Sequence, residues 1–231
     1  MNIDKIAWDF DLSKIRLRQS EIDDVVSELT SFITNIDFSA HFRSSHYSGE
    51  WSSFSLRSGS GREDDARNSE DGTYRNSKSL DGLHCTKAFL KRLEGVGSLR
   101  RVRLLKLARG TKVEKHIDLQ EAPKRGVLRI HLPIITDLNY RMTILDHSIS
   151  WPVGKLSVAD FSVPHALENN GPDRTHLVID LDGKSSVVDF LVGYKQRNIT
   201  EEVSVFLQQL YTAFARNEVI NFLIGWWRYG R

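Results

Sequence analysis

The fold is decided by residues 127–145, VLRIHLPIITDLNYRMTIL. This stretch holds two β-rich runs, 128–135 and 140–145, and Asn139 marks the turn between them. Short runs of aliphatic and β-branched residues bounded by turn residues are typical of β-strands. Three similar runs lie outside it, at 103–108, 155–158 and 176–181. Because these runs follow one another without intervening helical patterns, residues 101–182 are predicted to form an antiparallel sandwich or barrel.

The segments on both sides of this core have helical patterns. Apolar residues recur at helical spacing in 20–33, where Ser20 is the expected N-cap, and again in 200–227. A shorter helix is predicted at 86–93, before Gly95. Trp226 and Trp227 are expected to pack against the barrel. The chain is therefore divided into a mixed region (1–100), a β core (101–182) and a helical region (183–231), with the first region part of the same domain as the core.

Residues 57–80 form a polar stretch rich in Ser, Gly, Asp and Arg. The stretch has almost nothing apolar to bury, so a mobile surface loop is the simpler interpretation. The alternative is a lid that closes over a site.

The composition excludes several classes of protein. The 231 residues carry 32 basic and 30 acidic side chains, a net charge of +2 that indicates neither nucleic acid nor an anionic membrane as a partner. Cys85 is the only cysteine, which excludes an intrachain disulfide and a zinc cluster of cysteines. The first residues do not read as a signal peptide, and no stretch has the length of a membrane span. A reducing cytoplasm is the expected location.

His116-Ile117-Asp118 is the first motif that suggests a metal site. Residues two apart in a strand point to one face, so an imidazole and a carboxylate would converge. His165, at the end of a predicted β run, can supply a second imidazole. Two histidines and one carboxylate form the facial set of non-haem iron enzymes, which leaves coordination positions open.

Arg174 begins the next run, and a hairpin would bring its strand beside that of His165. A planar, permanently charged guanidinium suits a carboxylate, whereas the simpler alternative is a surface arginine after a turn. His176 shares the face of Arg174, and His165 is preferred to it as the metal ligand. His176 is then a pocket residue or a hydrogen-bonded core histidine.

Arg129 and His131 share one face of an otherwise apolar strand. If that face is the inner one, burial of two polar groups is costly unless they meet an anion. The equally weighted alternative is a polar outer face, with Ile130 and Leu132 directed to the core.

These motifs together resemble the aspartyl/asparaginyl β-hydroxylase family. The resemblance covers roughly residues 101–182 and rests on 104–111, His116–Asp118, Arg129–Pro133 and the segments around His165 and Arg174. It implies a double-stranded β-helix core with cupin-like, jelly-roll topology and flanking helices. It also implies an Fe(II)/2-oxoglutarate oxygenase in which His116 and His165 bind iron and Arg174 binds the 2-oxoglutarate tail. By the same resemblance, Arg129 and His131 lie near the other end of 2-oxoglutarate or the substrate carboxylate.

Two departures from the family pattern affect this interpretation. The vertebrate enzymes carry glycine where this chain has Asp118, so the chain resembles the bacterial branch, which includes free amino-acid hydroxylases. Leu105 stands where those enzymes use a serine against 2-oxoglutarate, so another group must assist Arg174. With Asp118 as the third ligand, a halogenase is disfavoured.

The function expected from the resemblance is hydroxylation of a C–H bond of an amino acid or a derivative, with O2 consumed and succinate and CO2 produced. Arg103, Arg129 and His176 are the candidate substrate-binding residues, and a substrate carboxylate is expected to meet the two arginines. The alternatives are a peptidyl or carrier-bound substrate, a cupin-like metal-binding module without oxygenase activity, and a structural β domain. The sequence determines neither the substrate nor the oligomeric state.

Overall fold

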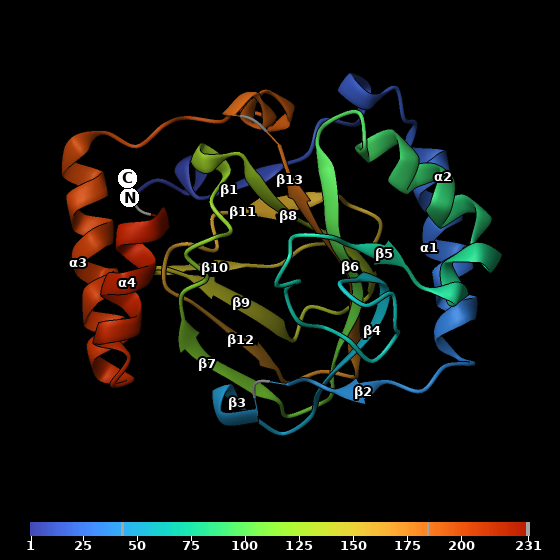
Figure 1. Ribbon diagram of the computed structural model, residues 1–231, viewed down its shortest axis with the longest axis horizontal. Helices are drawn as coiled ribbons and strands as arrows, with labels where there is room; N and C mark the ends of the chain where they lie inside the picture. The colour runs from blue at the N-terminus through green and yellow to red at the C-terminus, as the bar shows by residue number, and fades with distance from the viewer. Residues whose placement is uncertain (43, 184, 230–231) are drawn as a thin grey trace.

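Two antiparallel sheets form the centre of the computed structural model, which describes residues 1–42, 44–183 and 185–229 (Figure 1). The larger sheet has the order β1-β11-β8-β13-β6-β4-β2, with β5 paired to β4, and the smaller has the order β10-β9-β12-β7-β3. The strands are β1 Ala7–Asp9, β2 Ser39–Ala40, β3 Tyr47–Ser48, β4 Trp51–Ser58, β5 Arg75–Asn76, β6 Ser98–Leu107, β7 Lys112–His116, β8 Val127–Ile135, β9 Tyr140–Ile144, β10 His147–Ile149, β11 Ser157–Ala159, β12 His165–Asn169 and β13 Arg174–Asp182. The predicted jelly-roll class, mainly β with flanking helices, is confirmed.

Four α-helices flank the sheets: α1 Gln19–Ile33, α2 His84–Leu93, α3 Ile199–Ala215 and α4 Val219–Tyr229. Helix α1 begins at Gln19, so the prediction of Ser20 as its N-cap was wrong. The side chain of Glu21 accepts a hydrogen bond from the backbone N–H of Arg18 there, which satisfies a donor that the helix itself leaves unpaired. The single predicted C-terminal helical segment is divided into α3 and α4 around Asn217, which has a positive φ of 56°.

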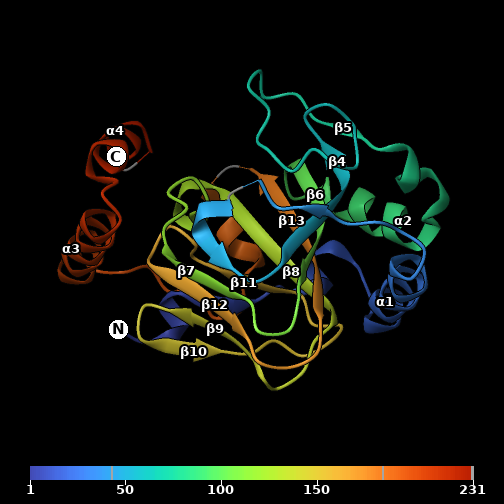
Figure 2. The same cartoon turned by 90° about the horizontal axis from the view of Figure 1, so that it is seen from below.

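The larger sheet is buried on both faces, and this explains its sequence pattern. Helices α1 and α2 cover one face (Figure 2). Ile130 and Leu132 of β8 belong to the main hydrophobic cluster on that side. The opposite face looks toward the smaller sheet, and Leu107 belongs to a second cluster there. Successive side chains on a strand point to opposite faces. Arg129 and His131 therefore face the space between the sheets, while Ile130 and Leu132 face the helices.

The polar stretch 57–80 folds back against the edge of the larger sheet. Arg57 of β4 pairs with Asn76 of β5, and the backbone N–H of Ser55 donates to the carbonyl of Glu63 at 2.7 Å. Ala66, in the middle of the stretch, is buried, and its carbonyl accepts hydrogen bonds from Arg101 at 3.3 Å and Arg103 at 3.5 Å. Part of the stretch is thus hydrogen-bonded to the sheet, which the expectation of a plain surface loop did not include.

Helices α3 and α4 form a hairpin at one edge of the molecule (Figure 2). The prediction that both terminal tryptophans pack against the barrel was wrong. Trp227 is 65% exposed, and the ring of Trp226 contacts Phe206 of α3, with centroids 5.2 Å apart. Among the described residues, no helix has the length and apolar character needed to cross a membrane.

Candidate metal centre and its surroundings

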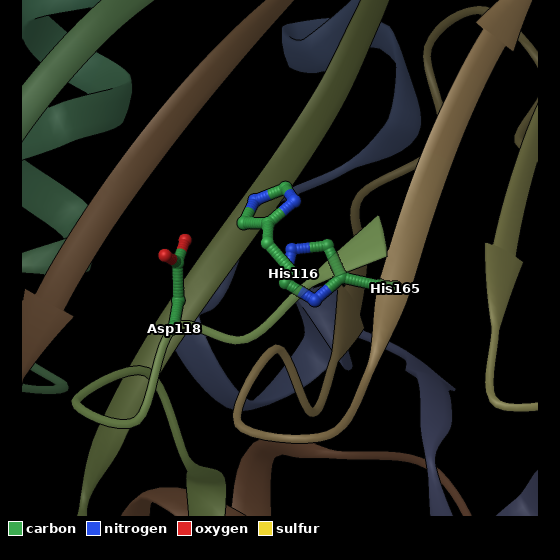
Figure 3. Close-up of side chains that lie close together, drawn as sticks. All are labelled: His116, Asp118 and His165. Carbon is green, nitrogen blue, oxygen red and sulfur yellow. The ribbon is translucent and has the colours of Figure 1, made fainter. Parts of the chain in front are cut away.

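His116, Asp118 and His165 come together between the two sheets. Their ligand atoms all lie within 4.8 Å of one another, and Figure 3 shows the three side chains around one shared space. His116 is the last residue of β7 and pairs in register with His165, the first residue of β12. Asp118 follows β7 and is held by a hydrogen bond from its backbone N–H to the carbonyl of Phe161 at 2.9 Å. The convergence expected of the sequence motif is therefore present, although Asp118 lies outside the strand.

Local backbone geometry orients both imidazoles. The Nδ1 atom of His116 lies 2.7 Å from the carbonyl of Glu114, and Nδ1 of His165 lies 2.9 Å from the carbonyl of Val163. A carbonyl only accepts, so each Nδ1 carries a proton, and in the neutral ring the lone pair that a metal requires is then on Nε2. Burial is the main cause that lowers the pKa of His165, and it favours the same neutral form.

Two expectations about His165 were wrong. It begins β12 rather than ending a run, and β12 and β13 do not form a hairpin. Strand β12 lies in the smaller sheet, whereas β13, which starts at Arg174, lies in the larger one. The turn that joins them is fixed by Asn169, whose side-chain amide donates to the carbonyls of Leu107 and Pro172 at 2.9 and 2.7 Å. The turn thus carries the chain from one sheet to the other.

Arg174 is buried between the two sheets, next to Tyr140 and His176. Its Nη2 donates to the hydroxyl of Tyr140 at 3.1 Å and lies 2.5 Å from Nδ1 of His176. Its guanidinium also lies over the Tyr140 ring, 4.3 Å from the centroid. Within 1–42, 44–183 and 185–229, no carboxylate forms an ion pair with Arg174, and its Nε has no hydrogen-bond partner. A buried, unpaired cation is costly, so the site is suited to an anion supplied from outside.

Two neutral histidines, His131 and His176, lie between Arg174 and the set His116, Asp118 and His165, which we call the metal group. Nδ1 of His131 lies 3.4 Å from Nδ1 of His176, and in the described structure the Nε2 atoms of both have no hydrogen-bond partner. Burial, followed by the charge of Arg174, lowers the pKa of both histidines well below the usual value. The ring of Phe161 lies between His131 and His165, with centroid separations of 5.2 and 5.0 Å. One continuous row of rings therefore runs from the metal group toward Arg174.

A network of ion pairs occupies the same side of the larger sheet. Asp180 of β13 lies at its centre, with its carboxylate 2.7 Å from Arg129, 2.7 Å from Arg101 and 2.9 Å from Arg103. Arg129 continues the network, because its Nη1 lies 2.5 Å from Asp118. The Asp180–Arg129–Asp118 chain thus connects the central strand of the sheet to the metal group.

In the part of the chain that the structure describes, the predicted surplus of inward-facing cations is not found. Three arginines of the network meet three carboxylates, since Glu121 lies 3.2 Å from Arg101 and 2.9 Å from Arg129. Burial opposes ionisation of Asp180, but the arginines hold its pKa well below the usual value. Burial, and then the charge of Arg101, lowers the pKa of Arg103 to about 9. Arg103 also keeps an Nε without a hydrogen-bond partner among the described residues.

A pocket of about 340 Å³ opens beside the metal group. His116 and Asp118 line it, together with Arg103 and Arg129, so both predicted substrate arginines reach the pocket. Its apolar lining comes from distant parts of the chain, including Trp51, Leu105 and Phe222. A larger open depression of about 1280 Å³ is lined by other residues, including Tyr74 and Arg100, and contains none of the metal group.

Sequence reasoning missed Tyr140, Asp180, Glu121 and Arg101. Two of them could have been found from their spacing. Asp180 lies four residues from His176 on β13, and Arg101 lies two residues from Arg103 on β6, so each pair is expected on one face of its strand. The hydroxyl of Tyr140 accepts a hydrogen bond from Arg174, a contact that the sequence left unidentified. Tyr140 belongs to a strand of the other sheet, so no spacing along the chain indicated this contact.

The fold and the donor set are those of a non-haem Fe(II)/2-oxoglutarate oxygenase. The sequence profile of the family described as aspartyl/asparaginyl beta-hydroxylase matches residues 19–183, and the chain belongs to this family. The match begins well before the region that supported the sequence resemblance. No significant match is found among curated protein sequences.

Solved structures resemble this chain at low sequence identity. The epimerase SnoN in complex with Fe3+, alpha ketoglutarate and nogalamycin RO is 9% identical, with 78% of this chain and 80% of that chain covered and a TM-score of 0.50. A prolyl-4-hydroxylase from Pseudomonas putida is 14% identical, with 73% and 89% covered and a TM-score of 0.44. The cofactor class expected from the sequence, Fe(II) with 2-oxoglutarate, agrees with the family and with the His-Asp-His group.

Proposed function

We propose that this protein is an Fe(II)/2-oxoglutarate-dependent dioxygenase that hydroxylates a C–H bond of an amino acid or an amino-acid derivative. The observation that carries the proposal is the combination of the His116/Asp118/His165 group with the buried, acid-free guanidinium of Arg174. A metal-binding module without oxygenase activity would need the first feature but has no use for the second.

His116, Asp118 and His165 would hold the iron. Two imidazoles whose Nδ1 contacts leave Nε2 as the donor atom, together with one carboxylate, match the donor set that iron prefers in such enzymes. Arg129 acts on this group by its ion pair with Asp118, which fixes the direction of the carboxylate. When bound, iron and 2-oxoglutarate supply the oxidising chemistry that converts C–H to C–OH with O2, giving succinate and CO2.

Arg174 would bind the distal carboxylate of 2-oxoglutarate. Its unpaired Nε and the Tyr140 hydroxyl offer donors to that carboxylate, and the fork of the guanidinium suits a planar anion. His131 lies between Arg174 and the metal group and would contact the body of the co-substrate. His176, which was expected to contact the substrate, lies against Arg174, and we assign it to the same carboxylate site.

The pocket beside His116 and Asp118 would receive the substrate. Arg103 and Arg129 line it, and Arg103 keeps a donor atom that its internal partners do not use. An α-amino acid fits these features, since its carboxylate can meet Arg103 while its side chain contacts Trp51 and Leu105. Arg129 already forms ion pairs with three carboxylates of the chain. We therefore expect it to orient Asp118 rather than to bind the carboxylate of 2-oxoglutarate or of the substrate.

The test is anaerobic titration of the full chain with Fe(II) and 2-oxoglutarate. A weak visible charge-transfer band and a calorimetric binding signal for 2-oxoglutarate are expected. Absence of both would refute the oxygenase assignment. A screen for succinate formation over free amino acids, short peptides and carrier-bound aminoacyl groups then identifies the substrate class.

A further inference from the structure

The outer face of the α3–α4 hairpin carries an exposed apolar surface, which we call the outer stripe. On α3 the exposed residues follow one another at intervals of four and three, the spacing of one helix face. They are Ile199, Val203, Leu207, Tyr211 and Phe214. On α4 a second row has the same character and consists of Ile220, Leu223, Ile224 and Trp227.

The opposite faces of the two helices are used inside the molecule. Val205 and Ala213 of α3 are buried, and the side chain of Gln209 donates to the carbonyl of Ser162 at 2.5 Å. Phe222 of α4 is buried and lines the pocket beside the metal group. Phe206 joins the two helices, because its ring contacts Phe222 at 6.0 Å between centroids. The packing of the described chain therefore accounts for the inner faces, whereas the side chains of the outer stripe are 47–84% exposed.

The outer stripe is too large for the surface of an ordinary monomer. Of the seventeen exposed large apolar side chains in the described structure, nine belong to the outer stripe. At their exposures they present on the order of 1,000 Å² of surface, whereas the largest apolar patch of a typical monomer covers about 300–600 Å². A standard interface buries about 800 Å² on each partner, and this stripe can supply that area by itself.

We propose that the outer stripe is a self-association surface through which two copies of this chain pack their hairpins into a four-helix bundle. Two antiparallel helices that each carry an exposed apolar row can form half of such a bundle. A two-fold axis brings identical rows into contact, and apolar rows avoid the like-charge contacts that charged ones would create there. Tyr211, Phe214 and Trp227 are of the residue types enriched at interfaces.

The charge of the hairpin disfavours a lipid surface as the occupant. Helices that lie on membranes are usually rich in Lys and Arg on the polar face. Residues 199–229 contain more acidic than basic side chains. The charged residues are Glu201, Glu202, Arg216, Glu218 and Arg228.

The test measures the mass of the full chain by sedimentation velocity from about 1 to 100 μM, since dimerisation depends on concentration. The wild type is expected at twice the chain mass of 26.5 kDa. The double variant Leu207→Glu/Tyr211→Glu is expected to dissociate at least ~100-fold more readily, because two charges would be buried at the centre of the bundle. Both substitutions lie on α3, and neither residue lines the pocket.

The control is Leu138→Glu, which places the same charge on a residue that is 93% exposed in a turn outside the hairpin, and it should remain dimeric. If circular dichroism shows that the charged double variant does not fold, Leu207→Ala/Tyr211→Ala is used in its place. This variant is expected to weaken dimerisation by about 10-fold. A wild type that stays monomeric over the whole range would overturn the proposal, as would a dimer that both double variants leave intact. A monomer that co-sediments with phosphatidylcholine/phosphatidylglycerol vesicles would assign the stripe to lipid instead.

Discussion

His116 and His165 are direct cross-strand partners, and their ring centroids lie 4.2 Å apart. The pairing of β7 with β12 alone brings the two imidazoles together, and their Nδ1 contacts to backbone carbonyls turn both lone pairs away from those strands. A metal site of this kind depends on register, because a slip by one residue would move one ring to the other face of the sheet.

The proposed ligand set predicts different results for two histidines. His165→Ala should weaken Fe(II) or Mn(II) binding by more than ~100-fold, because it removes a donor that no neighbour replaces. His176→Ala should keep the metal and weaken 2-oxoglutarate instead, since His176 contacts Arg174. Calorimetry on the two purified variants measures both constants. Loss of metal in the His176 variant, with retention in the His165 variant, would reverse the assignment.

The co-substrate site predicts a graded series at Arg174. Arg174→Leu should cost about 2–5 kcal/mol of 2-oxoglutarate binding, because the co-substrate carboxylate would be buried without a partner. Arg174→Lys should recover only part of that loss, since a point charge does not reproduce the planar fork. Tyr140→Phe should cost about 1 kcal/mol, the value of one hydrogen bond. Exposed Arg109→Leu is the matched control, and an unchanged 2-oxoglutarate affinity in Arg174→Leu would show that another residue binds the carboxylate.

The ion-pair network predicts a large loss of stability on neutralising its centre. Asp180→Asn should lower the free energy of unfolding by about 3–5 kcal/mol, because three arginines would lose a buried partner. Asp81→Asn breaks the exposed pair with Lys87 and should leave stability nearly unchanged. Urea unfolding followed by circular dichroism compares the variants. Equal stability of the two would mean that the network is not held together by Asp180.

The buried neutral histidines predict a loss of stability in mild acid. The folded-state pKa values of His131 and His176 lie well below the usual 6.5, so the unfolded chain binds more protons as pH falls through 6.5. Stability from these groups is therefore present above pH 6.5 and lost below it, by up to about 1.4 kcal/mol per histidine at pH 5.5. Urea unfolding at pH 7.5 and 5.5 should show this loss in the wild type and in exposed His84→Gln. In the variant His131→Gln/His176→Gln, the free energy of unfolding should differ much less between the two pH values. If this variant keeps the pH dependence of the wild type, the two histidines are not its cause.

The substrate pocket predicts a requirement for a carboxylate on the substrate. An amino acid that supports succinate formation should do so better than its amide or its decarboxylated amine, because only the acid can pair with Arg103. Arg103→Gln should reduce that preference more than it reduces the maximal rate. If the amide and the amine are used as well as the acid, the arginines of the pocket have only a structural role.

Much of the architecture could be predicted because it follows from local pattern. The runs that became β6, β8, β9 and β13 were recognised from their aliphatic and β-branched residues between turns. Short or polar strands were not predicted from the sequence. Strand β12 begins with a histidine and contains Glu168, and β7 contains three charged residues. A strand stabilised by its neighbours needs little apolar signal of its own, so its sequence alone does not reveal it.

By itself, the sequence determined the residue types that can bind iron and a carboxylate, and their order along the chain. Alternation on a strand also placed His176 with Arg174 and His131 with Arg129, because a period of two is a property of the backbone. Only the tertiary structure decided which of these groups meet. Arg129 and Arg103 form ion pairs with Asp180 across paired strands. Tyr140 accepts a hydrogen bond from Arg174 across the two sheets. Such contacts join residues far apart in sequence, and the pairing of strands and sheets that creates them depends on the packing of the whole core.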